Sequence, residues 1–143
     1  MILLCDISDY IASLGIARKE HCYHGIMPDK EEESIGTYPQ KRGRPPDMVI
    51  GGLENKSYET RELSFLVHWN HSPTDTEKAA FNLYHALRDT VNAKVNGHTI
   101  AFVKMSHEEP IAVGADEKGV IEYVIECMFY IRAEQIEKEE RKG

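Results

Sequence analysis

The sequence has little of what marks secreted, membrane-spanning or disulfide-stabilised proteins. Its three cysteines, Cys5, Cys22 and Cys127, lie far apart and are odd in number, which argues against a disulfide framework and for reduced thiols in a cytosol. Apolar stretches are interrupted within about five residues, so no membrane span is expected. Because the start lacks a basic leader, we also expect no signal peptide and a protein that acts in the compartment where it is made.

Positive charge is also scarce. The chain has 17 lysines and arginines against 24 aspartates and glutamates, a formal net charge of −7 that gives no general attraction to DNA or to anionic membranes. Any contact with DNA would therefore be local. With 41% hydrophobic and 29% charged residues in 143 positions, the composition is that of one soluble globular domain with a single core.

Two segments have the periodicity of amphipathic helices. Residues 1–15 place four apolar side chains on one helical face: Leu4, Ile7, Ile11 and Leu14. A second helix is predicted to begin at a capping box formed by Thr74 and Glu77, after Pro73 has ended the preceding strand. Its apolar stripe consists of Ala80, Leu83, Tyr84, Leu87 and Val91. We expect this helix to pack on a sheet.

Strand patterns flank the second helix. Over residues 58–71 the inward series is Leu63, Phe65, Val67 and Trp69, and Trp69 is predicted to be a core anchor. Residues 98–105 follow an Asn96-Gly97 turn and are expected to form a strand that is apolar on both faces. Ile100 and Phe102 are predicted to lie on the same face of this strand. The last strand, residues 120–132, has these inward side chains: Ile121, Tyr123, Ile125, Cys127, Phe129 and Ile131. A further short strand is expected at residues 22–27.

The predicted fold is therefore α+β. We expect one domain over residues 1–133, with a mostly antiparallel sheet of about four strands packed against an N-terminal helix and a central helix. Residues 134–143 are predicted to form a charged, frayed tail.

A long loop is predicted over residues 28–46, where the apolar period is lost apart from a short candidate strand near residues 35–38. It carries an acidic run and then a basic one, with Lys41, Arg42 and Arg44, which we expect to contact a partner. The segment Arg42-Gly-Arg44-Pro45 is similar to the core of an AT-hook, which lies in the minor groove of A·T tracts. A solvated basic turn is the simpler interpretation, because the rest of the chain repels DNA.

The outward side of the last strand mixes apolar and charged residues. Val124, Met128 and Tyr130 alternate there with glutamates and an arginine, which is too apolar for plain solvent surface and too charged for a core. These three residues are predicted to form a subunit interface. The alternative is that the N-terminal helix covers this side.

No catalytic or cofactor site is expected. The histidine patterns His21-Cys22-x-His24 and His68-x-x-His71 lack four converging ligands, and His68 and His71 fall on opposite faces of a strand. Asp47, Glu54 and Lys56 have the residue types of a nuclease site, but residues 54–57 are typical of a polar turn rather than a supporting strand, and the acidic balance provides no cleft for phosphates. Because no nucleophile elbow, phosphate loop or Cys-x-x-Cys motif occurs, we predict a protein that is not an enzyme and needs no metal or cofactor.

The order of these elements resembles the tail-terminator and minor capsid proteins of long-tailed bacteriophages. The stretches that carry the resemblance are Glu62-Leu-Ser-Phe-Leu-Val-His-Trp69, Ala79-Ala-Phe-Asn-Leu-Tyr-His-Ala-Leu-Arg88, and Pro110-Ile-Ala-Val-Gly-Ala-Asp-Glu-Lys-Gly119 before the final strand. A Pro-x-x-x-Gly-x-Asp turn commonly precedes that strand in such proteins. The resemblance extends from the N-terminal helix to about Arg132.

This resemblance implies an assembly role and a final location in the virion, at the tail or neck. During assembly the protein would be in the host bacterial cytoplasm. It implies a homo-oligomeric ring, typically a hexamer, that caps the tail tube protein, contacts a head-completion or neck protein, and meets DNA only as it passes through the lumen. No membrane contact is implied. The alternative function is a small DNA-associated accessory protein that uses the segment Arg42-Gly-Arg44-Pro45.

Overall fold

Ten helical and strand elements follow one another in the computed structural model, which describes residues 1–27, 31–40 and 58–133. In chain order they are α1 (Leu4–Ser13), η1 (Lys19–His21), β1 (Cys22–His24), β2 (Ser34–Pro39), β3 (Tyr58–His68), α2 (Pro73–Arg88), β4 (Val91–Val95), β5 (His98–Met105), β6 (Ile111–Ala115) and β7 (Ile121–Arg132). Within these three ranges no helix is long and apolar enough to cross a membrane.

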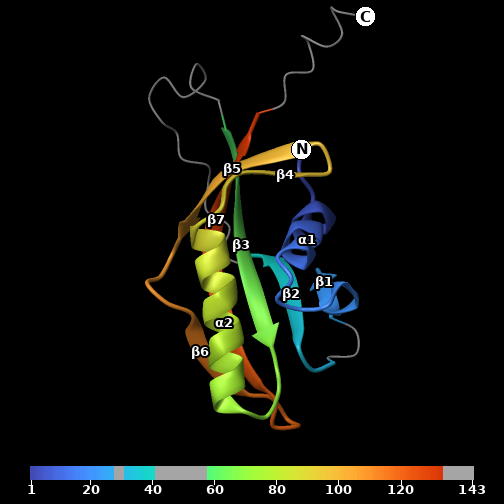
Figure 1. Ribbon diagram of the computed structural model, residues 1–143, viewed down its shortest axis with the longest axis vertical. Coiled ribbons are helices and arrows are strands. Elements are labelled where there is room, and N and C mark those ends of the chain that lie inside the picture. The colour runs from blue at the N-terminus through green and yellow to red at the C-terminus, as the bar shows by residue number, and fades with distance from the viewer. Residues whose placement is uncertain (28–30, 41–57, 134–143) are drawn as a thin grey trace, which may run out of the picture.

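One curled, mixed sheet of seven strands organises the domain (Figure 1). The hydrogen-bonded order is β1-β2-β3-β7-β5-β4, and β6 also pairs with β7. Strand β7 pairs with β3 along one edge, while its other edge is shared between β6 at the start and β5 toward the end. Among the strands of the described residues, β1 and β2 form the one parallel pair. The α+β class is confirmed, but the prediction of about four strands is wrong because short strands extend the sheet.

The additional strands lack the patterns by which strands are recognised. All five residues of β6 are exposed, so no apolar alternation marks it. The helical stripe suggests that α2 continues to Val91, yet α2 ends at Arg88 and Val91 is 67% exposed in β4. Strand β2, by contrast, confirms the short strand expected near residues 35–38 of the predicted loop; it runs from Ser34 to Pro39 and its first four residues are buried. The residues at 28–30 and 41–46 of that loop lie outside the described ranges.

Both helices pack on the same side of the sheet and share one core (Figure 1). The inward residues of β3, Leu63, Phe65 and Val67, are fully buried as predicted. The core also contains, from the helices, Ile7, Ile11, Ala80, Leu83, Tyr84 and Leu87, and from the later strands, Ile100, Ile125, Cys127, Phe129 and Ile131. The alternative in which the N-terminal helix covers the outward side of β7 is therefore wrong.

Two local predictions fail for identifiable reasons. Helix α2 begins earlier than expected: Ser72 is its N-cap, the hydroxyl of Ser72 accepts a hydrogen bond from the Asp75 backbone N–H, and Pro73 occupies the first turn. In β5, a register shift between Ile100 and Phe102 reverses the alternation. Ile100 is therefore in the core, whereas Phe102 points outward and is 38% exposed.

Asp6 joins helix α1 to the turn between β4 and β5. Its carboxylate accepts hydrogen bonds from the Leu3 backbone N–H and from the Asn96 side-chain amide, both at 2.9 Å. These bonds, that of Leu3 first, hold the pKa of the Asp6 carboxyl below its ordinary value of 3.8. The charged form thus stabilises both the start of the helix and its docking on the sheet.

We expect Asp6→Ala to lower the free energy of unfolding by about 1 kcal/mol at neutral pH. Because the folded pKa of Asp6 is depressed, this contribution is complete above the unfolded pKa and is lost as the pH falls through the folded value. Urea unfolding at pH 7 and near pH 3 measures the difference. Asp9→Ala is the control, because Asp9 bonds the same Asn96 amide but no helix N–H. An Asp6→Ala deficit of equal size at both pH values would contradict this prediction.

Candidate functional site

The outer face of the sheet, meaning the side opposite the two helices, carries the predicted interface residues. Val124, Met128 and Tyr130 are partly buried there and alternate along β7 with inward, buried side chains. No helix covers this outer face within the ranges that the structure describes. The sequence therefore predicted the position of these three residues on one surface.

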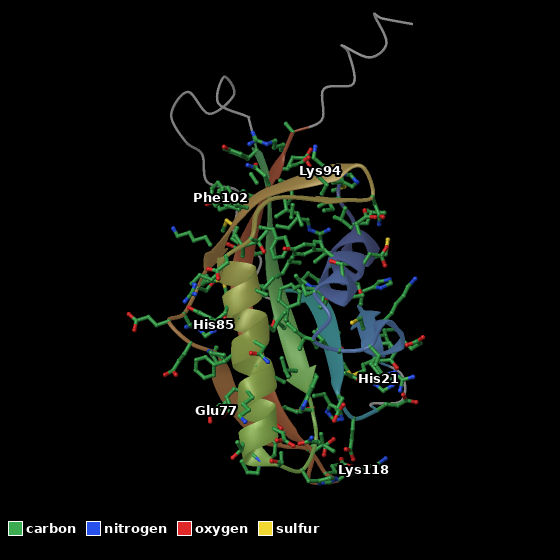
Figure 2. The ribbon with its side chains drawn as sticks, in the orientation of Figure 1. His21, Glu77, His85, Lys94, Phe102 and Lys118 are labelled. Carbon is green, nitrogen blue, oxygen red and sulfur yellow. The ribbon has the colours of Figure 1, made fainter. Side chains whose placement is uncertain are left out.

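An aromatic cluster of Tyr58, Phe102 and Tyr130 forms one end of the outer face. The rings of Phe102 and Tyr130 stack with centroids 4.4 Å apart, and Tyr58 meets both edge-on at 5.7 and 6.1 Å. Tyr58 is 40% and Phe102 38% exposed, and Figure 2 shows Phe102 at the edge of the molecule. Exposed aromatic groups of this kind are enriched in protein interfaces.

Apolar residues continue from the aromatic cluster along β7. The cross-strand partners of Val124 are Leu66 on β3 and Ile111 on β6, so an apolar patch surrounds it. Met128 instead lies between Glu62 on β3 and Lys104 on β5. The outer face is thus an apolar stripe with charges at its centre, which suits specific association better than burial in a core.

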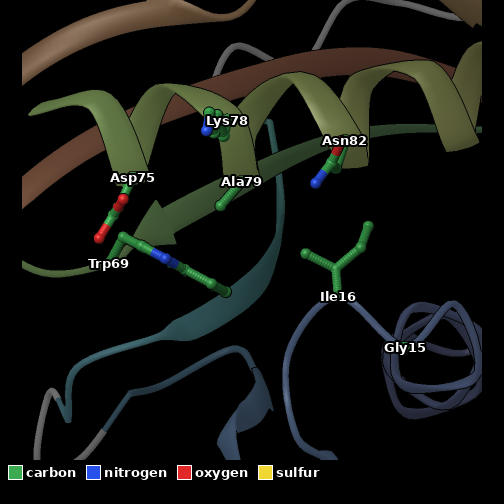
Figure 3. A pocket seen from close by; sticks show the side chains of 7 residues that line it. All are labelled: Gly15, Ile16, Trp69, Asp75, Lys78, Ala79 and Asn82. Atoms are coloured by element: carbon green, nitrogen blue, oxygen red, sulfur yellow. The ribbon is translucent and has the colours of Figure 1, made fainter.

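Trp69 lies at the boundary between the core and a cavity of about 380 Å³. It follows β3 directly, is partly buried, and packs against the core cluster. The cavity is bordered by Ile16 after α1 and by Ala79 and Asn82 of α2, and Figure 3 shows the indole lying across it. Trp69 thus contacts the core on one side and this cavity on the other.

We expect Trp69→Ala to lower the free energy of unfolding by about 3 kcal/mol, the lower end of the range for a large aromatic side chain, because one side of the indole is already open. Urea unfolding of the parent, Trp69→Ala and Trp69→Phe tests this. Trp69→Phe keeps an aromatic ring against the core and should lose clearly less. A melting temperature of Trp69→Ala within a degree or two of the parent would contradict the prediction.

A second group of polar side chains converges at the far end of β3. His68 is completely buried, and its Nδ1 lies 2.7 Å from Oε2 of Glu122 at the start of β7. The Nε2 of His68 lies 3.8 Å from Oδ2 of Asp116 and makes no hydrogen bond in the part of the chain that the structure describes. The ligand atoms of His68, Asp116 and Glu122 all lie within 4.8 Å of one another.

The turn between β6 and β7 positions Asp116. Its Oδ1 accepts hydrogen bonds from the backbone N–H groups of Lys118 and Val120, both at 2.9 Å, and its Oδ2 lies on the side of His68. The resemblance implied a Pro-x-x-x-Gly-x-Asp turn here, but residues 111–115 of that pattern form β6, so the turn begins only at Asp116. The sequence gave no sign of the histidine contact. The alternation places His68 and Glu122 on the same side of their strands, yet only the register between β3 and β7 makes them neighbours.

The histidine patterns noted in the sequence do not come together. His21 pairs with Glu31 at 2.9 Å, and His71 lies 3.4 Å from Glu32 and 3.1 Å from the carbonyl oxygen of Gly119. Each of these exposed or partly exposed histidines thus has a partner of its own.

Several candidates from the sequence fall outside the described residues. These are the basic residues Lys41, Arg42 and Arg44, the AT-hook-like segment that contains them, and the nuclease-like set Asp47, Glu54 and Lys56.

Comparison with known families agrees with the resemblance seen in the sequence. The sequence model of one family, described as bacteriophage tail terminator protein, matches residues 10–132, a span that reaches from α1 to the end of β7. No curated protein matches the chain. Tail terminators are structural components of the phage virion and are not known as enzymes. The chain belongs to the bacteriophage tail terminator family and has a structural role in the phage tail.

Proposed function

We propose that copies of this chain close into a ring, with six subunits as the resemblance implies, which caps the tail tube, stops its polymerisation and joins the tail to the head connector. The observation that carries the proposal is the outer face, where Val124, Met128 and Tyr130 form an apolar stripe. An apolar stripe that ends in exposed stacked aromatics favours association with another protein surface.

A ring of more than two subunits is built from heterologous, head-to-tail contacts. Each subunit therefore needs two different surfaces, one for each neighbour. Strand β6 offers a suitable second surface. One of its edges pairs with β7, and its five residues, Ile-Ala-Val-Gly-Ala, are uncharged and exposed. Apolar edge strands tend to pair with other chains unless they are protected. We propose that the outer face and the β6 edge of adjacent copies form the ring contact.

The charge of the chain fits a ring through which DNA passes. A net charge of −7 fits an acidic rather than a basic lumen wall. Such a wall would repel the phosphates of DNA, so DNA would pass without being held. The tail tube protein and a head-completion or neck protein are the proposed neighbours along the tail axis.

The test is the mass of the purified protein by light scattering, combined with negative-stain images, alone and with tail tubes. We expect a discrete multiple of the 16.3 kDa subunit mass with a central hole, either in solution at high concentration or at the ends of tubes. A monomer at every concentration that also leaves tube ends unoccupied would overturn the proposal.

A further inference from the structure

We propose that His68, Asp116 and Glu122 bind a divalent transition-metal ion such as Zn²⁺ or Mn²⁺, which fastens the β6–β7 turn to the end of β3. The ligands come from three separate segments: the end of β3, the turn after β6, and the start of β7. This inference does not depend on ring formation.

The first support is the unpartnered nitrogen of a buried histidine. The His68 side chain is 0% exposed, its Nδ1 faces Glu122, and its Nε2 has no hydrogen-bond partner among the described residues. A buried polar atom in this state is costly unless a ligand, a water or a proton satisfies it. The Nε2 faces the Asp116 carboxylate, so a cation between them would give this nitrogen a partner.

The second support is the spacing of the groups. The 3.8 Å between His68 Nε2 and Asp116 Oδ2 is too long for a hydrogen bond. Two ligands that each lie about 2.0–2.2 Å from one zinc ion in a tetrahedral site are roughly 3.3–3.6 Å apart. A shift of a few tenths of an ångström would therefore bring these two atoms into a coordination sphere.

Glu122 completes the group in one of two ways that chemistry allows. Its Oε2 accepts the Nδ1–H of His68 when Nε2 is a ligand, an arrangement that orients metal-bound imidazoles in many proteins. Its carboxylate also lies within 4.8 Å of the other ligand atoms and can reach the ion directly. Loss of its charge should weaken binding in either case.

The donor set defines the class of ion and its access. One imidazole with carboxylates suits Zn²⁺ and Mn²⁺, whereas Mg²⁺ prefers oxygen ligands alone. The side chains of Asp116 and Glu122 are 16% and 12% exposed, so an ion can reach them from solvent and water can complete its coordination.

The experiment is titration calorimetry and thermal unfolding of the metal-free full chain with ZnCl₂ or MnCl₂, and with MgCl₂ at the same concentrations. The main variant is Asp116→Asn, which keeps an oxygen for the Lys118 and Val120 N–H bonds that form the turn. Glu122→Gln keeps an acceptor for the His68 Nδ1–H. The matched control is Glu126→Gln, the same substitution on the same strand, beside the exposed His107.

We expect one ion per chain, an increase in melting temperature with Zn²⁺ or Mn²⁺, and a Kd weakened at least about tenfold in Asp116→Asn and Glu122→Gln but unchanged in Glu126→Gln. Three results would each overturn the proposal. The first is no binding at ~1 mM metal, which a protonated imidazole between the two carboxylates would give. The second is equal binding in all variants, and the third is an equal effect of Mg²⁺.

Discussion

Phe129→Ala is expected to lower the free energy of unfolding by about 3–5 kcal/mol, a large part of the 5–15 kcal/mol that stabilises an ordinary domain. Phe129 is 0% exposed in the second half of β7, the strand that pairs with β3, β5 and β6. Its ring packs against Phe65 of β3 with centroids 6.0 Å apart. Truncation therefore leaves a cavity where the two longest strands and the helices meet, and close-packed neighbours relax only partly into it.

Urea unfolding followed by circular dichroism measures the loss at position 129. Phe129→Leu retains most of the apolar volume and should lose clearly less. Tyr130→Ala is a second control, because it removes an aromatic ring from the adjacent position on the outer face rather than from the core. A Phe129→Ala deficit no larger than that of Tyr130→Ala would contradict the assignment of β7 to the centre of the core.

The elements predicted correctly are those that bury one complete face. In β3, Leu63, Phe65 and Val67 alternate with residues that are polar apart from Leu66, and in α2, Leu83 and Leu87 recur at helical spacing. For these segments the core imposes a period that the sequence must follow, so periodicity is sufficient to identify them.

The elements that were missed have no such constraint. Strand β6 has no buried residue and is held by backbone hydrogen bonds to β7. These hydrogen bonds do not depend on the identity of the side chains. Strand β4 is short and mostly exposed, so Val91 appeared to continue the helix. The reversed orientation of Phe102 depends on a bulge, an irregularity of pairing rather than of composition.

The two candidate sites differ in the same way. Val124, Met128 and Tyr130 lie on one strand, so alternation alone places them together on the outer face. His68 and Glu122 are separated by 54 positions, and their contact depends on the pairing of β3 with β7. Asp116 joins them only because its turn folds back onto β3. A single sequence contains no signal for that register.

Met128→Lys is expected to prevent ring formation and tube capping while leaving the isolated subunit folded. Met128 is partly buried between Glu62 and Lys104 on the outer face, so in the free subunit a lysine can extend its ammonium group into water. In the proposed ring contact the same charge would be withdrawn from water between Glu62 and Lys104. We expect each contact to weaken by about 2 kcal/mol or more, roughly 30-fold, and a ring repeats the loss at every interface.

Light scattering and negative-stain imaging with tail tubes compare the parent, Met128→Lys and Met128→Leu. Met128→Leu is the matched control, because it keeps an apolar side chain of similar volume and should preserve the ring. Thermal unfolding of the monomeric variant establishes that the domain itself is intact, and we expect its stability to remain within about 0.5 kcal/mol of the parent. If Met128→Lys forms rings and caps tubes as the parent does, the outer face is not the contact between subunits. A folded monomer that leaves tube ends open would instead assign to Met128 a role in assembly that its place outside the core does not otherwise require.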